Sequence, residues 1–265
     1  MTLRPVSPRA PLQLGDRDAR VGGAPERESI EEKIDEQVDR IARLQRMLYA
    51  DGRHALLVVL QARDAGGKDG TIRKVFTGVN PQGVEVASFK VPSEHELRHD
   101  FLWRIHQRVP PRGIIGIFNR SHYEDVLVTR VNRIIPKSVW ERRYGEINEF
   151  ERMIAASGVV ILKFFLHISR AKQRERLEER LSDPEKNWKF RAGDLDDRAK
   201  WSAYTAAYRD ALRRCSTPWA PWYVVPADDK KVRTLLVART IADTLDGMGL
   251  EWPKADPAVL GLEID

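Results

Sequence analysis

The sequence has a single cysteine, Cys215, among its 265 residues. One thiol excludes an intramolecular disulfide and a multi-cysteine metal site, and such sparse use of cysteine is typical of a reducing compartment. The sequence also lacks any apolar run approaching the roughly 18 to 20 residues of a membrane span, and residues 1–11 lack the apolar stretch of a signal peptide. We therefore expect a cytoplasmic protein with no membrane partner.

A large excess of charge of one sign is also missing. Lys and Arg outnumber Asp and Glu by 45 to 39, which gives a formal charge of +6, although 32% of the residues are charged. This balance predicts a surface of both signs with a modest positive surplus. A nucleic acid, a phosphorylated metabolite or a phosphate polymer would each suit such a surface, and charge alone does not choose among them.

Domain organisation follows from where periodic patterns begin and end. Residues 1–28 mix Pro, Arg and Gly without periodicity, which predicts a poorly ordered or surface-draped arm. At 42% hydrophobic, the chain is long enough for one large α/β domain, which we assign to residues 29–250. Residues 251–265 are expected to form a C-terminal tail.

Short apolar runs alternate with stretches of helical periodicity, which predicts a doubly wound parallel sheet between helices. Residues 55–60 are an unbroken apolar run, as in a strand covered on both faces. The other expected strands are 84–89, 113–118, 159–166 and 222–225. Expected helices are 29–51, capped by Ser29 with Glu32, then 94–109, capped by Ser93 with Glu96, 138–156, 170–181, 198–214 and 231–248.

One segment fits the sheet poorly. Residues 182–197 are polar, contain Pro184 and Gly193, and lie between two expected helices. They are typical of a mobile lid that closes over phosphates and excludes water. Acidic residues are interleaved with the nearby cations, so we expect only one or two of those cations to contact substrate. The cations are Arg170, Arg174, Arg176, Arg180, Lys186, Lys189 and Arg191.

The chemistry begins at residues 62–69, which read A-x-x-x-x-G-K-D. The phosphate loop of nucleotide-binding proteins reads G-x-x-x-x-G-K-[ST], because backbone N–H groups and one lysine must surround a phosphate at a helix N-terminus. Ala62 replaces the first glycine, and Asp69 replaces the hydroxyl residue that normally binds Mg²⁺. The context still predicts a phosphate site, since a buried strand enters and a helix follows. The alternative is an ordinary glycine-rich turn with an exposed lysine.

The missing hydroxyl raises the question of a metal ligand, because Mg²⁺ takes hard oxygen ligands, usually one or two carboxylates plus substrate phosphates. Asp64 is our first candidate and Asp69 a lesser one. The alternative for each is charge complementarity with a helix N-terminus, which needs no metal.

Polar residues follow the third expected strand, at the edge where ligands bind in open α/β sheets. Asn119 offers a neutral oxygen, and the planar guanidinium of Arg120 suits phosphate oxygens. Two carboxylates, Glu124 and Asp125, come a turn later. Their alternative interpretation is a solvated helix start.

A competing motif is His95-Glu96-x-x-His99 on an expected helix, the pattern of a zinc protease. No third zinc ligand is evident downstream. The alternative interpretation, which needs no metal, is a polar helix face.

With these residues placed, the chain resembles the polyphosphate kinase 2 family, and within it the class that accepts both AMP and ADP. The resemblance runs over residues 29–247. Its most specific stretches are QARDAGGKDG at 61–70, HDFLWRIHQ at 99–107, FNRSHYEDV at 118–126, WKF at 188–190 with GDL at 193–195, and APWYVVPA at 220–227.

The resemblance implies a P-loop kinase-like three-layer α/β/α fold with a parallel sheet and a helical lid. It implies transfer of the terminal phosphoryl group of inorganic polyphosphate to AMP and ADP, giving ADP and ATP. The implied cofactor is Mg²⁺, with Mn²⁺ as an alternative. Family members are often dimers or tetramers, so a homo-oligomer is expected.

The family's site residues carry over to matching positions. Asp64, Lys68, Arg120 and Asn119 are the implied catalytic residues, with Asp64 as metal ligand. Much of the family has Asp in place of Asn119, and Asn119 paired with Glu124 is linked to use of the shorter acceptor. The implied phosphate- and nucleotide-binding residues are Ala65, Gly66, Gly67, Asp69, Gly70, Ser121, Glu124, Arg180, Lys189 and Asp194.

Two other functions stay open at this point. One is a kinase of the same fold that takes phosphate from ATP. The other is a basic nucleic-acid-binding protein with a degenerate phosphate loop. The mixed-sign sequence and the absence of a recognisable recognition helix or aromatic platform argue against the second, so we expect no nucleic-acid partner.

Overall fold

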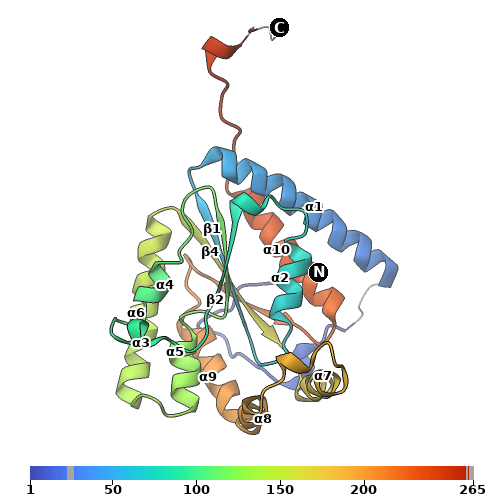
Figure 1. Cartoon of the computed structure of the whole chain (residues 1–265), viewed down its shortest axis with the longest axis vertical. Helices are drawn as coiled ribbons and strands as arrows, with labels where there is room; N and C mark the ends of the chain where they lie inside the picture. The colour runs from blue at the N-terminus through green and yellow to red at the C-terminus, as the bar shows by residue number, and fades with distance from the viewer. Residues whose placement is uncertain (23–26, 261, 263–265) are drawn as a thin grey trace.

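A five-stranded parallel sheet forms the centre of the computed structural model, which describes residues 1–22, 27–260 and 262 (Figure 1). The strand order is β2-β3-β1-β4-β5, and every neighbouring pair is parallel. All of the expected strands are present. They are β1 (Ala55–Ala62), β2 (Val84–Ser88), β3 (Ile115–Asn119), β4 (Val159–His167) and β5 (Trp222–Pro226).

Helices cover both faces of this sheet, so the expected three-layer arrangement is confirmed (Figure 1). One face carries α1 (Arg27–Asp51), α2 (Lys68–Val75) and α10 (Lys230–Gly247). The other carries α4 (Trp103–His106), α5 (Glu124–Val131), α6 (Lys137–Ala156) and α9 (Trp201–Arg214). The remaining elements are α3 (Glu94–Leu97), α7 (Arg170–Ser182), α8 (Gly193–Ala199) and short 3-10 helices at Asp16–Ala19, Pro81–Gly83, Asn187–Lys189 and Pro257–Val259.

The apolar run of β1 explains its central place in the sheet. Leu56, Val58 and Leu60 pack with the α1 and α10 side, whereas Leu57 and Val59 pack with the α5 and α6 side. A strand that is buried on both faces needs apolar residues at every position, which is why the run is unbroken.

The site is positioned by the ends of the strands. Leu60 of β1 lies opposite Asn119, the last residue of β3. Because all strands run in one direction, their carboxyl ends meet at one edge of the sheet. Figure 1 shows α7 and α8 beside this edge. Ligands bind at this edge in open α/β sheets.

The single helix expected over residues 94–109 is wrong, because two short helices, α3 and α4, replace it. The predicted cap is present: the Ser93 hydroxyl accepts the Glu96 amide, and the Glu96 carboxylate accepts the Ser93 amide. The Asp100 carboxylate then accepts the Leu102 amide at 2.9 Å. Such a local bond offers the backbone an alternative to the helix.

The cap expected at Ser29 is also wrong. α1 already begins at Arg27, so Ser29 lies inside the helix, and its hydroxyl accepts from the Lys33 ammonium at 2.9 Å. Arg and Glu are good helix formers, which is why the helix already begins before the serine.

A short part of the N-terminal arm lies along β5. Pro5 pairs with Tyr223 as an antiparallel bridge, and the Val6 amide donates to the Trp222 carbonyl at 2.8 Å. Leu14 and Ala19 are buried. The arm thereby covers part of an edge strand that would otherwise expose unpaired backbone groups. Residues 23–26, also within the predicted arm, lie outside the described residues.

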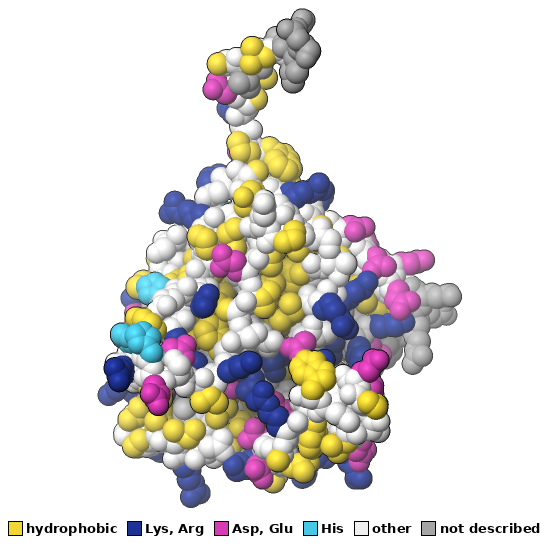
Figure 2. All heavy atoms as spheres, viewed as in Figure 1, with side chains coloured by type: hydrophobic (Ala, Val, Ile, Leu, Met, Phe, Trp, Pro, Cys, Tyr) yellow, Lys and Arg dark blue, Asp and Glu magenta, His cyan; other side chains and the backbone are white. Residues whose placement is uncertain are grey.

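The surface carries both signs of charge, as the composition predicts. On the face shown in Figure 2, the Lys and Arg side chains are interspersed with Asp and Glu. The tail extends away from the body of the molecule after Glu251, whose amide donates to Asp51 Oδ2 at 2.8 Å, and its last residues are not described (Figure 1). Among the described helices, none combines the length and apolar character that crossing a membrane would require.

Candidate active site

The loop between β1 and α2 turns sharply through left-handed backbone. Its φ angle is +59° at Ala65 and +97° at Gly67, the residue before α2. A β-carbon on Gly66 would lie 2.6 Å from the Ala62 β-carbon and 2.8 Å from the Arg63 carbonyl oxygen. Glycine is therefore required at position 66, and its missing side chain makes the room that Ala62 occupies. This packing explains how the loop tolerates alanine at its first motif position.

The loop leaves backbone amides free at the start of α2. Within the described residues, the amides of Gly67, Lys68, Asp69 and Gly70 have no hydrogen-bond acceptor. Free amides at a helix N-terminus carry partial positive charge and favour an anion. The Lys68 ammonium lies 3.4 Å from the Ala62 carbonyl oxygen, and burial together with the nearby Arg120 lowers the pKa of Lys68.

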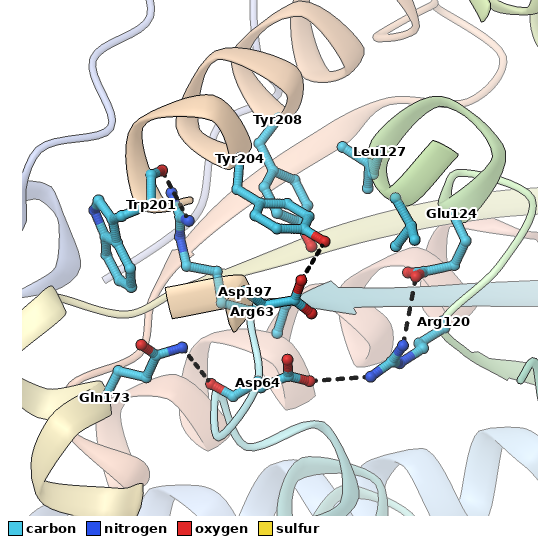
Figure 3. Close-up of a pocket in the computed structure, with 12 residues that line it drawn as sticks. Arg63, Asp64, Arg120, Glu124, Leu127, Gln173, Asp197, Trp201, Tyr204 and Tyr208 are labelled. Atoms are coloured by element: carbon cyan, nitrogen blue, oxygen red, sulfur yellow. Dashed lines mark hydrogen bonds and ion pairs between the residues drawn. The ribbon is translucent and has the colours of Figure 1, made fainter. Parts of the chain in front are cut away.

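Arg120 faces the loop from the end of β3. Its φ angle is +63°, a strained value for a residue with a side chain, and its amide donates to the Leu60 carbonyl at 3.0 Å. The guanidinium lies 3.0 Å from Asp64 Oδ1 and 3.5 Å from Glu124 Oε2 (Figure 3). Burial acts to lower the pKa of Arg120, but the two carboxylates outweigh it and raise that pKa. A charged guanidinium is thus held beside the loop.

Glu124 completes this cluster of charges. Burial raises the pKa of the Glu124 carboxyl, although Arg120 and Lys68 act in the opposite direction. A carboxyl group with a raised pKa in a cleft is typical of a functional site. Asp125, the neighbouring candidate, lies elsewhere: its carboxylate is 3.3 Å from Arg143 and 3.9 Å from Arg104.

Asn119 also reaches the loop, but Ser121 does not. Asn119 Nδ2 donates to Asp69 Oδ1 at 2.8 Å, and an aspartate at position 119 could not make this bond. The Ser121 hydroxyl is fully buried and accepts from Gln61 Nε2 at 3.1 Å and from the Tyr123 amide at 3.2 Å. The structure therefore places the Ser121 side chain in the core.

The expected lid residues contact one another. Arg180 Nη1 lies 3.4 Å from Asp194 Oδ2 and 3.4 Å from the Lys189 carbonyl oxygen. The Lys189 ammonium lies 4.9 Å from the centre of the Trp188 ring. Burial, and after it the charge on Asp64, raise the pKa of Asp194.

A pocket opens beside Asp64 and Arg120, with residues of α8 and α9 along its other side (Figure 3). Asp197 accepts the Tyr204 hydroxyl at 2.9 Å, and burial raises the pKa of Asp197. The Arg63 guanidinium stacks on Trp201, 3.8 Å from the ring centre.

Sequence reasoning missed the pocket residues of α9. Trp201, Tyr204 and Tyr208 recur at helical spacing and line the pocket together. That spacing next to the polar lid was the available signal, but an aromatic stripe of this kind is more often part of a core.

The sequence was compared with models of protein families, and the result agrees with this architecture. The family model described as polyphosphate kinase 2 matches residues 25–252. The chain belongs to the polyphosphate kinase 2 family. The predicted enzyme class, a kinase among the transferases, is therefore confirmed.

Individual relatives agree with the family assignment. The chain is 58% identical over 219 residues to an AMP/ADP-polyphosphate phosphotransferase from Meiothermus ruber, a match that covers 83% of this chain and 82% of the relative. It is 47% identical to an ADP-polyphosphate phosphotransferase from Rhodopseudomonas palustris, covering 88% and 84% of the two chains. A crystal structure of polyphosphate kinase 2 from Arthrobacter aurescens has a TM-score of 0.83 at 38% identity and covers 96% of this chain and 95% of its own.

The zinc alternative has no structural basis in the described part of the chain. α3 ends at Leu97, so His99 lies beyond the helix that the motif requires. The Glu96 carboxylate accepts the Ser93 amide at 2.7 Å, and the His99 ring stacks on Trp103. Across the described residues, three or more His, Cys, Asp or Glu side chains nowhere gather in a way that could hold a metal ion.

Membership of a kinase family points to a divalent cation, and the loop offers suitable oxygen donors. Asp64 and Asp69 supply carboxylates, and Asn119 supplies an amide oxygen. Mg²⁺ is usually held by one or two carboxylates plus substrate phosphates, without a cage of protein ligands. The donor set around the loop fits that kind of site.

Proposed function

We propose that this member of the polyphosphate kinase 2 family transfers the terminal phosphoryl group of inorganic polyphosphate to AMP and ADP, giving ADP and ATP. The observation that carries the proposal is the loop itself, where free amides and Lys68 stand at the start of α2 and Arg120 contacts Asp64 of the same loop at 3.0 Å. The names of the relatives supply the donor and the acceptors.

The donor's terminal phosphate would lie on the loop. Ala65, Gly66 and Gly67 of the loop lead into α2, where Asp69 and Gly70 follow Lys68. The amides of Gly67 to Gly70 have no acceptor among the described residues, as in an anion-binding site. The ammonium of Lys68 adds a full positive charge there. Phosphoryl transfer depends mainly on positioning and on stabilising charge, and this loop supplies both.

The transfer itself would be an in-line displacement. A β-phosphate oxygen of ADP, or an α-phosphate oxygen of AMP, attacks the terminal phosphorus, and the shortened polyphosphate leaves. Lys68 and Arg120 stabilise the charge on the transferring group, and the planar guanidinium can bind two of its oxygens. No covalent intermediate with the protein is needed.

Asp64 would both orient Arg120 and bind the cation. Its carboxylate orients Arg120 at 3.0 Å and, with substrate phosphates, would hold Mg²⁺, or Mn²⁺ in its place. The bound cation would neutralise charge that develops on the phosphoryl oxygens. Asp69, held by Asn119, is the second carboxylate within this region.

The pair Asn119 and Glu124 would permit the shorter acceptor. Asn119 adds no negative charge beside Asp69, and Glu124 holds Arg120 from the side away from Asp64. A neutral residue at position 119 reduces repulsion of an AMP phosphate that must approach the loop closely. The relative with the name AMP/ADP-polyphosphate phosphotransferase supports this choice.

The lid would close the site against water. Arg180 contacts both the Lys189 carbonyl and Asp194, and cations from this segment can meet the phosphates of the substrates. The pocket of Trp201 and Tyr204 adjoins the same point and would take the nucleotide. We retain Ser121 as a residue that shapes the site through its buried hydrogen bonds.

An acceptor profile tests the proposal. The purified protein is incubated with polyphosphate and Mg²⁺ and with AMP or ADP, and nucleotides are quantified by chromatography. The proposal predicts ADP from AMP and ATP from ADP. Product from ATP and a nucleoside, with none from polyphosphate, would instead favour the ATP-dependent kinase. Assembly into a dimer or tetramer stays a prediction, to be measured by light scattering.

A further inference from the structure

Buried side chains from two helices hold the phosphate loop at three consecutive carbonyl groups. Two of the donors lie on α7, and the third lies on α10. Each donates to a different loop carbonyl. The pairs are Gln173 Nε2 with Asp64 O (3.1 Å), Arg176 Nη1 with Ala65 O (3.0 Å) and Arg233 Nη1 with Gly66 O (3.5 Å).

The two arginines are buried without carboxylate partners. Arg176 is 6% exposed and Arg233 is 3% exposed. Arg176 also donates to the carbonyls of Ala227 and Asp228, at 2.8 Å and 3.0 Å. Among the described residues neither guanidinium forms an ion pair, and each Nε lacks an acceptor. Burial lowers the pKa of Arg233 to about 10, so it stays charged at neutral pH.

A buried charge without an opposite charge beside it lowers the stability of a fold, because hydrogen bonds to carbonyl groups replace only part of its lost hydration. The position of the two arginines shows what would offset their charge. Both guanidinium groups lie directly beneath the loop on which a polyphosphate end would bind, so the bound anion would offset their charge. A loss of stability that is concentrated at a binding site indicates that the residues responsible for it serve the function.

The hydrogen bond of Arg233 also fixes the direction of a free amide. In a trans peptide the C=O and N–H groups point in opposite directions. A donor that draws the Gly66 carbonyl downward therefore turns the Gly67 amide toward the anion site, and that amide has no acceptor among the described residues. Gln173 acts in the same way on the peptide between Asp64 and Ala65.

Gly67 and Arg233 are fitted to each other. A β-carbon on Gly67 would collide with the Arg233 guanidinium, and the φ angle of +97° independently favours glycine. The glycine of the loop thus makes room for a guanidinium that comes from another helix.

We propose that Arg233, with Arg176 beside it, is a positioning residue of phosphoryl transfer. It holds the Gly66 carbonyl so that the Gly67 amide points at the donor phosphate, and it places a buried positive charge beneath that phosphate. The role rests on the proposed function.

Arg233→Met tests the role, because methionine fills similar space without charge or donor. We expect kcat/KM with polyphosphate and ADP to fall about tenfold or more. We expect the melting temperature to be unchanged or higher, since an unpaired buried charge is removed. Arg233→Lys keeps the charge and a donor and should recover part of the activity.

Arg239→Met is the matched control, since Arg239 lies on the same helix and donates to the Met1 carbonyl, away from the loop. It should keep wild-type kinetics. Calorimetric affinity for polyphosphate, without nucleotide, separates this inference from the proposed function: wild-type protein should bind more tightly than Arg233→Met even if it transfers nothing. Equal affinity and equal kcat/KM in Arg233→Met and wild type would overturn the inference. Activity that falls only in step with a lower melting temperature would also overturn it.

Discussion

Replacing Lys163 by methionine should lower the free energy of unfolding by about 3 to 5 kcal/mol. Lys163 lies on β4 with none of its side chain exposed. Its ammonium is 2.5 Å from Glu151 Oε2, 2.8 Å from the Tyr123 hydroxyl and 2.7 Å from the Cys215 carbonyl. Methionine fits the space but leaves the Glu151 carboxylate buried without its cation. Removing one partner of a buried pair costs far more than the pair itself contributes.

The melting temperature should reveal this loss. At about 2 °C per kcal/mol for a chain of this size, the midpoint should fall by about 6 to 10 °C. Lys172→Met is the matched control, because Lys172 pairs with Glu175 on the surface at a similar 2.5 Å, and such pairs contribute at most about 1 kcal/mol. The double variant Lys163→Met with Glu151→Leu should recover much of the loss.

The same comparison has a predictable pH dependence. Burial acts to raise the pKa of Glu151, but Lys163 and His122 outweigh it, so the pKa is lowered. The stabilisation from a carboxyl group of this kind is present above its ordinary pKa and is lost as the pH falls. The difference between wild type and Lys163→Met should therefore shrink in acid. A neutral-pH loss no larger than that of Lys172→Met would refute the reasoning.

Two further substitutions probe the active site, and a third probes the buried Asp125 next to Glu124. Asn119→Asp removes the donor to Asp69 and adds a repelling charge, so AMP turnover should fall roughly tenfold relative to ADP turnover in the acceptor profile. Gly67→Ala should lower kcat/KM about tenfold or more, since a β-carbon collides with Arg233; steady-state kinetics beside a melting curve measure this. Burial raises the pKa of Asp125 to about 6, so its contribution to stability is complete below about pH 4 and is lost as the pH rises through about 6. Relative to Asp125→Asn, wild type should lose about 2 to 3 kcal/mol between pH 4 and pH 7 in urea unfolding, and parallel curves would contradict this.

The sheet could be predicted because its signal is local. Each strand is a short apolar run, and the run in β1 is buried at every position. A strand, a glycine-rich turn, a lysine and a helix follow in order, so the phosphate loop could be located despite Ala62 and Asp69. The polar residues after β3 could be placed at the same edge, because parallel strands end together.

The errors in the helices also have local causes. Periodicity alone does not show that the Asp100 side chain bonds the Leu102 amide and interrupts the helix. It does not show that α1 continues beyond Ser29 either, because a serine can lie inside a helix as well as cap it. A side-chain bond decides the first case, and the helix propensity of the residues before Ser29 decides the second.

The support beneath the loop could not be predicted from the sequence. Arg176 is one of several cations on a helix rich in charges, and sequence reasoning treats that group as solvated or as substrate contacts. Arg233 lies 167 residues from Gly66, which its guanidinium contacts. Only the packing of α7 and α10 against the strand ends brings these side chains under the loop.

Formation of ATP from ADP and polyphosphate, with no ATP added, tests the central claim most directly. A parallel reaction without polyphosphate corrects for ATP formed from ADP alone. The account predicts polyphosphate-dependent ATP from the wild type and at least about a hundredfold less from Lys68→Ala, whose melting curve should match the wild type. ATP that does not depend on polyphosphate, or undiminished turnover by Lys68→Ala, would contradict it.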